Sequence, residues 1–236
     1  MKKIFNTENL IRFIFFTFIA STIYVVVRIV LAPTVAPSAE ITIRVKSDYV
    51  LMLVQCLLGV LALLIPRILK DRIKLNIPNA MIIAYAVFLY CAIYLGEVRN
   101  FYYRIPHWDT ILHTFSGVAL GALGFFLVNL LNKPKSIPLS MSPVFIALFA
   151  FFFALALGAM WEMYEFTIDY FLHTNSQKYA LESGQMLVGQ DALMDTMKDL
   201  VVDALGALVM SLIGFFSLKK DKRWIDQFQI TVEKAN

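Results

Sequence analysis

Apolar residues are gathered in six long runs, and the polar stretches between them contain most of the prolines. Each run is long enough to cross a bilayer as a helix, which takes roughly 20 mainly apolar residues. The first run is longer than the apolar region of a signal peptide, about 7–15 residues, and we expect it to be an uncleaved span. The predicted spans are residues 11–32, 50–69, 79–97, 109–131, 144–171 and 195–218.

The composition supports this pattern. Hydrophobic residues make up 59% of the 236 residues and charged residues only 16%, against about 25% in soluble domains. The sequence therefore predicts an all-α polytopic membrane helix bundle that forms one integral-membrane domain over residues 1–236. Its partner is the lipid bilayer, and we expect no nucleic-acid partner despite the net charge of +4. Cys56 and Cys91 fall inside apolar runs, which argues against a disulfide framework.

The lysines and arginines give the orientation of the spans. With six spans, both termini share one side of the membrane with the second and fourth loops. That side carries fourteen of the 21 basic residues and the opposite side seven. Because cytoplasmic segments are enriched in lysine and arginine, both termini are predicted to be cytoplasmic.

Three predicted helix ends bring ionisable residues to the opposite, outer side: "HWDTILHTFSG", "WEMYEFTIDYF" and "DALMDTMKDLVVDALGA". Asp109 and His113 are four residues apart and share a helical face. Glu162 and Glu165 are three apart and also share a face. The last segment carries aspartates at 191, 195, 199 and 203, which span about 18 Å along a helix and cannot all serve one small site.

Acids this close to the membrane interior must be neutralised by protons, basic partners or a metal ion. Lys198 is the basic residue that the sequence places among them. Carboxylates and a histidine on facing helices form metal sites in helix bundles, and this donor set suits a divalent ion such as Zn, Mn or Fe, with Mg an alternative. The predicted metal ligands are Asp109, His113, Glu162, Glu165 and Asp199, with Asp195 or Asp203 as a general base.

Simpler explanations exist for single residues. Asp109 and Asp191 are suited to helix N-caps, and the acids together are also compatible with a protonated or hydrogen-bonded structural cluster. Caps do not explain Asp199 and Asp203, which lie beyond the first helical turn. A C-terminal helix end, where Glu162 lies, disfavours anions.

The segments "HWDTILHTFSGVALGALGFFL", "GAMWEMYEFTIDYF" and "DALMDTMKDLVVDALGAL" resemble the YjdF-like bacterial inner-membrane proteins, a family of unknown function. The resemblance covers roughly residues 50–218. It implies a multi-pass protein of the bacterial cytoplasmic membrane, and the predicted topology turns the acidic cluster to the extracytoplasmic side.

Two classes of function fit these residues. A metal site at the outer leaflet favours metal-dependent hydrolysis or transfer on a lipid or lipid-linked envelope substrate. Intramembrane acids are also typical of a cation or proton-coupled transporter, and a scaffold or sensor with a structural metal is a third alternative. The sequence does not choose between them, and it gives no oligomeric state.

Overall fold

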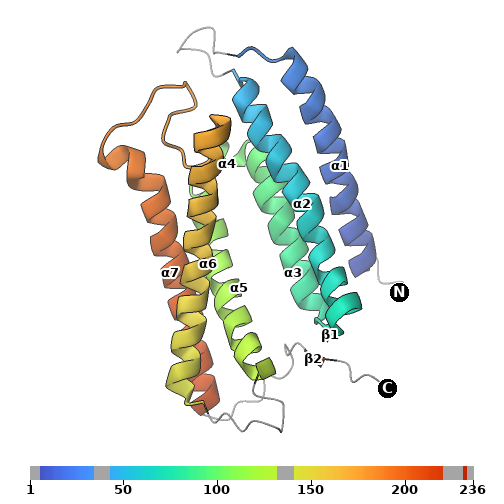
Figure 1. The fold of residues 1–236 in the computed structure, drawn as a ribbon, viewed down its shortest axis with the longest axis vertical. Coiled ribbons are helices and arrows are strands. Elements are labelled where there is room, and N and C mark those ends of the chain that lie inside the picture. Colours follow the sequence, from blue (N-terminus) through green and yellow to red (C-terminus); the bar gives the residue numbers. More distant parts are fainter. Residues whose placement is uncertain (1–5, 35–42, 132–140, 220–230, 233–236) are drawn as a thin grey trace. The chain divides into compact units, whose positions relative to one another are not determined.

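The computed structural model describes residues 6–34, 43–131, 141–219 and 231–232 (Figure 1). The predicted all-α membrane bundle is confirmed, because six helices in this part of the chain are long and apolar enough to cross a membrane. The cytoplasmic position of the termini stays a prediction. Several basic residues behind it, such as Lys2 and Lys133, lie outside the described residues.

The helices and strands follow the predicted spans closely. Their bounds are α1 Thr7–Leu31, α2 Lys46–Ile73, β1 Leu75–Asn76, α3 Asn79–Leu89, the π-helix η1 Tyr90–Val98, α4 Phe101–Arg104, α5 Trp108–Leu131, α6 Pro143–Leu172, α7 Gln190–Lys219 and β2 Thr231–Val232. The third span runs through α3 into η1. The two short strands pair antiparallel, with Leu75 opposite Val232.

Local sequence signals explain where some of these helices begin. The Asn6 side chain accepts a hydrogen bond from the Glu8 backbone N–H at 3.3 Å and caps α1. Ser142 Oγ accepts from the Phe145 N–H at 3.2 Å, and Pro143 takes the first helical position of α6. Both arrangements satisfy or avoid backbone donors that a helix start leaves without partners.

The chain forms two compact units, and each is described by itself. The first contains residues 1–68, 79–109 and 163–196, and the second contains residues 69–78, 110–162 and 197–236. In the first unit, α1, α2 and the α3–η1 helix pack around a buried apolar core (Figure 1). Gly59 on α2 makes room there, because a Cβ atom would lie 2.6 Å from Ile93 Cδ1 and 2.8 Å from the Phe18 ring.

The second unit brings together α5, most of α6 and most of α7 through small residues. Gly124 on α5 lies against the α6 backbone at Ala150, where a Cβ atom would come within 2.7 Å of the Ala150 Cα. Gly214 on α7 lies under the ring of Phe125. Small residues at such positions let membrane helices approach closely, and this approach positions the site described next.

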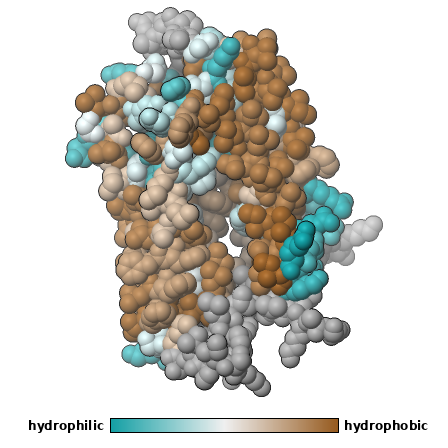
Figure 2. Space-filling model, viewed as in Figure 1, coloured by the Kyte–Doolittle hydropathy of each residue, from teal (hydrophilic) through white to brown (hydrophobic). Residues whose placement is uncertain are grey.

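The outer surfaces of the helices are apolar over most of their length. In Figure 2 the visible face is largely brown. Paler and teal residues gather around the segment that joins α6 to α7, and a second teal group lies at the end of α2. Large side chains such as Phe16, Val30 and Phe171 are 66%, 75% and 71% exposed. Exposed apolar side chains in such numbers are expected where lipid is the surrounding solvent.

Candidate metal centre

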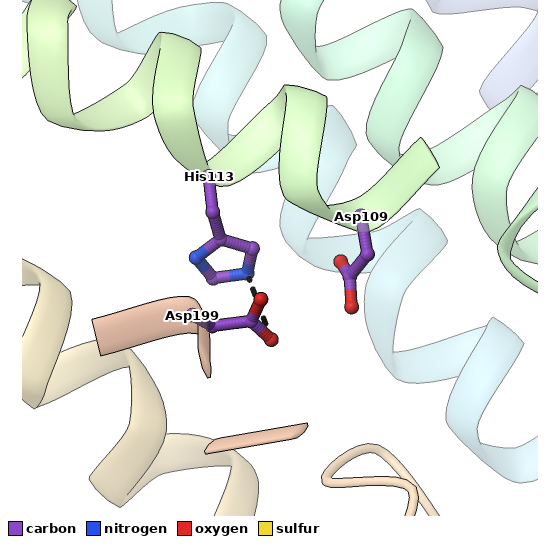
Figure 3. Close-up of side chains that lie close together, drawn as sticks. All are labelled: Asp109, His113 and Asp199. Carbon is purple, nitrogen blue, oxygen red and sulfur yellow. Dashed lines mark ion pairs between the residues drawn. The ribbon is translucent and has the colours of Figure 1, made fainter. Parts of the chain in front are cut away.

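The imidazole of His113, on α5, lies between two aspartates of α7. Its Nδ1 is 3.2 Å from Asp203 Oδ2, and its Nε2 is 3.8 Å from Asp199 Oδ2 (Figure 3 draws His113 with Asp199). The two aspartates are four residues apart, so they lie on neighbouring turns of one face of α7. Each aspartate is only 2% exposed.

The carboxylate of Asp203 is fixed by α5 and enclosed by α6. Its Oδ1 accepts a hydrogen bond from Ser116 Oγ at 2.7 Å, while its Oδ2 faces His113. Ser116 Oγ is also 2.8 Å from the His113 carbonyl oxygen, so its one hydrogen is shared between two acceptors. Gly158 closes the other side, because a Cβ atom there would lie 2.7 Å from Asp203 Oδ2. These contacts hold the Asp203 carboxylate on the Nδ1 side of the imidazole, while Asp199 faces Nε2.

Two glycines allow α5 and α7 to meet at this depth. A Cβ atom on Gly117 would run into the backbone carbonyl oxygen of Asp203, and one on Gly206 would lie 2.5 Å from the carbonyl oxygen of Thr114. The helices therefore touch backbone to backbone on both sides of the His113–Asp203 contact. A larger residue at either glycine would push Asp203 away from the imidazole.

Asp109 completes a group of three possible ligands. Asp109, His113 and Asp199 each offer one ligand atom, and these atoms all lie within 4.8 Å of one another (Figure 3). Asp109 is the last residue of the first unit, but it stands one turn before His113 on the same helix. Two ligands about 2.1 Å from a tetrahedral ion are about 3.4 Å apart, so the separation of 3.8 Å between His113 and Asp199 is close to that of a bound state.

The donor set fits a divalent metal ion. One imidazole and two carboxylates suit Zn, Mn or Fe, and three protein ligands leave coordination positions open, as in catalytic sites. Asp203 adds a second carboxylate on the other ring nitrogen of His113. Metal-binding histidines usually have such a partner, which fixes the tautomer and orients the ring.

The other predicted ligands and the predicted general bases are not members of this group of three. Glu162 is 5% exposed on α6 and lies one turn after Gly158, outside the group of three. Glu165 and Asp195 belong to the first unit. Their assignments as ligand and general base stay predictions. Asp191 is exposed in the first turn of α7, but it is the second helical residue and not the N-cap that its sequence position suggested, because α7 already begins at Gln190.

Two further residues, Ser116 and Lys178, belong to the site or its surroundings, and neither was predicted from the sequence. Ser116 orients Asp203, and its position three residues after His113 was the available signal. Lys178 lies in the connection between α6 and α7. Burial disfavours its charge, but the carboxylates of Asp109 and three further acids outweigh burial and raise the pKa of Lys178 well above its usual value. A lysine in a polar loop gives no pattern that would reveal this.

The comparisons with known proteins agree with a membrane protein of uncharacterised type. Residues 18–220 match the family described as "Predicted membrane protein (DUF2238)". The chain belongs to this family. The match includes every residue of the candidate metal centre, and it confirms the expected resemblance to an uncharacterised membrane family.

One relative, an "Uncharacterized protein" from Thermotoga maritima, is 33% identical over 148 residues, which are 62% of this chain and 64% of that protein. The match therefore spans slightly less than two thirds of the relative's length. No solved structure matches the chain.

Proposed function

We propose that this membrane protein binds one divalent metal ion through Asp109, His113 and Asp199 and uses it for hydrolysis or group transfer on a lipid or lipid-linked substrate. One observation carries the proposal: the two ring nitrogens of His113 have different neighbours. Nδ1 is within hydrogen-bond distance of Asp203, and Nε2 faces Asp199 at 3.8 Å.

A neutral imidazole has one N–H donor and one nitrogen lone pair. If Nδ1 donates to Asp203, then Nε2 presents its lone pair towards Asp199 and the ion. The hydrogen bond from Ser116 Oγ to Asp203 Oδ1 fixes the carboxylate in the position in which it can accept from Nδ1. In this proposal Asp203 is a positioning residue. That role suits it better than the role of general base, because both of its carboxylate oxygens are already engaged by α5.

The proposed ligands differ in burial and in their position along the helices. Asp199 is buried and gives a negative charge at a fixed place, while Asp109 is half-buried and lies nearer the start of α5. A divalent ion there would supply Lewis acidity towards a phosphoryl or carbonyl oxygen and would lower the pKa of water. The carboxylates offset the charge of the ion, and the apolar helices around them exclude bulk water, which strengthens each charge interaction.

The substrate class follows from depth. His113 is the sixth residue of α5 and Asp199 the tenth residue of α7, so at 1.5 Å per residue both lie within about 14 Å of their helix N-termini. At this depth the site would be within reach of lipid head groups of one leaflet of the bilayer. The excess of basic residues on the other side favours the outer leaflet of a bacterial cytoplasmic membrane.

Cation transport is the second candidate, and Ser211 favours it. Ser211 continues the buried face of α7 below Asp203, and its Oγ is buried without a hydrogen-bond partner among the described residues. The ring of Phe125 packs on Gly214 just beyond it. A polar route would have to pass this ring, which is why we rank transport second.

Elemental analysis of the purified protein tests the proposal. We expect about one divalent ion per chain in the wild type and almost none in His113→Ala. His107→Ala is the matched control, because His107 is exposed in the turn before α5 and should leave the metal content unchanged. A wild type free of metal after purification in Mn²⁺ or Zn²⁺ would refute the proposal. Metal-dependent cation flux in liposomes would favour transport, and bound metal without flux or turnover would favour the scaffold or sensor.

A further inference from the structure

The first spanning helix carries an arginine close to its C-terminal end. Arg28 lies in the last turn of α1, whose 25 residues end at Leu31. At 1.5 Å per residue α1 is about 37 Å long, which exceeds the thickness of the hydrocarbon core by about 7 Å. Arg28 lies only about 5 Å before the end of the helix. This part of α1 therefore brings the Arg28 guanidinium to the boundary between the hydrocarbon and the lipid head groups.

A buried tyrosine of α2 holds this guanidinium in place. Arg28 Nε donates a hydrogen bond to the Tyr49 hydroxyl oxygen at 3.0 Å, and the guanidinium carbon lies 5.1 Å from the centroid of the Tyr49 ring. Tyr49 is 3% exposed and packs with Val25 and Met52. All four residues belong to the first unit, in which α1 and α2 lie side by side (Figure 1). The guanidinium thus has a defined position against α2, unlike an arginine that extends freely into water.

The face of α1 that carries Arg28 is turned outward. Tyr24 is four residues before Arg28 and Leu31 is three residues after it, so both share its face of the helix. Their side chains are 48% and 69% exposed, whereas Arg28 is half-buried. Because α1 is one of the six helices that can cross a membrane, exposed apolar side chains on it face lipid. The Arg28 guanidinium is therefore flanked by surface that contacts acyl chains.

Most of the hydrogen-bonding capacity of Arg28 is not used within the described part of the chain. A guanidinium has five N–H donors and keeps its charge, and the bond to Tyr49 uses one donor. Among the described residues, no carboxylate pairs with Arg28 and no backbone carbonyl accepts from its side chain. The C-terminal end of the α1 dipole favours the charge but gives the other N–H groups no acceptor. Charged donors without acceptors are costly next to hydrocarbon, so we expect an acceptor from outside the chain.

We propose that Arg28, held by Tyr49, binds the phosphate group of a membrane phospholipid in the leaflet that surrounds this end of α1. The two Nη groups carry parallel N–H donors, which match two oxygens of a phosphate. The head groups of phospholipids lie at the depth of Arg28, and the acyl chains of the same lipid can pack on Tyr24 and Leu31. A free phosphate ion would supply the oxygens but no acyl chains. This site does not depend on the metal ion proposed above.

Native mass spectrometry of the purified full chain measures this binding. We expect one phosphatidylglycerol molecule per wild-type chain and binding that is about tenfold weaker or more in Arg28→Gln, because charge-assisted hydrogen bonds are lost. Arg28→Lys keeps the charge without the paired donors and should have an intermediate affinity. Tyr49→Phe removes the hydroxyl that holds Nε and should weaken binding about threefold. Arg12→Gln is the matched control, because Arg12 on the same helix already pairs with Glu8 at 3.7 Å.

Three further measurements identify what Arg28 binds. A glycolipid with the same acyl chains but no phosphate should bind the wild type as weakly as phosphatidylglycerol binds Arg28→Gln, and equal binding of the two lipids would refute phosphate recognition. Millimolar inorganic phosphate should leave the lipid bound, and displacement would show that the site takes a free anion. Glu40 lies outside the described residues. Stronger lipid binding in Glu40→Gln would show that a carboxylate of the chain occupies Arg28, and the inference would then be wrong.

The arginine variants decide the remaining cases. Equal affinity of the wild type and Arg28→Gln for phosphatidylglycerol would overturn the inference. If Arg28→Gln does not fold, Arg28→Lys takes its place. Weaker lipid binding by a folded Arg28→Lys chain supports bidentate phosphate binding, and an unchanged affinity contradicts it.

Discussion

His113 and Lys178 both interact with carboxylates, but they do so through different chemical groups. Each places a nitrogen-bearing side chain in the field of carboxylates. At the first, an imidazole lies between Asp199 and Asp203. At the second, an ammonium group lies on the Tyr102 ring in the field of four carboxylates. An imidazole keeps a nitrogen lone pair that can bind a metal, whereas an ammonium group has none. The imidazole of His113 could therefore serve as a metal ligand, whereas the Lys178 ammonium group could not.

The supports of the two sites differ as well. His113 and Asp203 are positioned by helix-to-helix contact at Gly117 and Gly206. Lys178 is positioned by a loop that hydrogen bonds to Asp169. Helix packing gives a site with little freedom, so changes at the glycines should affect the His113 site and leave the Lys178 site nearly intact.

Gly117→Ala should have the largest effect. The added methyl group meets the backbone of Asp203, which cannot move without separating α5 from α7, and overpacking of this kind costs about 1–3 kcal/mol or more. We expect a lower Tm and a loss of metal binding by elemental analysis. Gly121→Ala is the control, because its Cβ would lie 3.1 Å from the Met210 Cβ, a contact that a shift of a few tenths of an ångström relieves. Equal effects of the two substitutions would contradict the backbone contact.

Asp203→Asn should have the next largest effect. Asparagine has nearly the same shape but no charge, so it holds the His113 tautomer less strongly. Loss of the partner of a metal-binding histidine lowers metal affinity about 10–100-fold. A Mn²⁺ or Zn²⁺ titration measures this. Complete loss of binding would indicate that Asp203 is itself a ligand, and no change would remove its positioning role.

Ser116→Ala should weaken the same site less. The substitution removes the hydrogen bond from a neutral hydroxyl to the charged carboxylate of Asp203. Such a bond contributes about 1.5–3 kcal/mol at most, and its loss affects the metal only through Asp203. We expect a decrease of metal affinity of about fivefold, with Ser116→Thr retaining most of the affinity. If Ser116→Ala and Asp203→Asn have equal effects on the titration, the order of contacts from Ser116 to Asp203 to His113 is wrong.

The pH dependence of the Lys178 site should be nearly flat. A group whose pKa is raised on folding contributes its full stabilisation below its unfolded value, about 10.4 for lysine, and loses it only as the pH rises through the higher folded value. The pKa of Lys178 is raised in this way. The Tm difference between wild type and Lys178→Met should therefore stay constant from about pH 6 to 9. A difference that shrinks within this range would show that the ammonium group loses its proton there.

Much of the fold was predictable because it depends on hydrophobicity alone. The six spans follow from apolar runs, and the helices begin or end within a few residues of the predicted limits. The switch from α3 to the π-helix η1 was not predictable, because the apolar run from 79 to 97 carries no signal for it. Arg44, from outside this helix, contacts its C-terminal end. Its guanidinium donates to the carbonyl oxygens of Glu97 at 2.9 Å and Val98 at 3.2 Å.

The candidate site was predictable in part, for a geometric reason. Four-residue spacing puts Asp109 and His113 on one helical face, and similar depth in the membrane predicted that Asp199 lies near them. One ligand atom of each of the three residues lies within 4.8 Å of the others, and their role as metal ligands stays a prediction. The same spacing turns each successive aspartate of α7 by about 40°. As a result, Asp199 and Asp203 are buried while Asp195 is half-buried and Asp191 is exposed. Lys178 could not be found, because its position depends on a loop whose shape is set by Asp169.

The central claim is that the His113 site binds one metal ion and that Asp199, not Asp195, is one of its ligands. The most direct test is the metal content per chain of two purified variants, Asp199→Asn and Asp195→Asn, which change aspartates one turn apart on α7. We predict about one ion per chain in the wild type and in Asp195→Asn, and almost none in Asp199→Asn. Loss of the ion in Asp195→Asn, or its retention in Asp199→Asn, would contradict the claim.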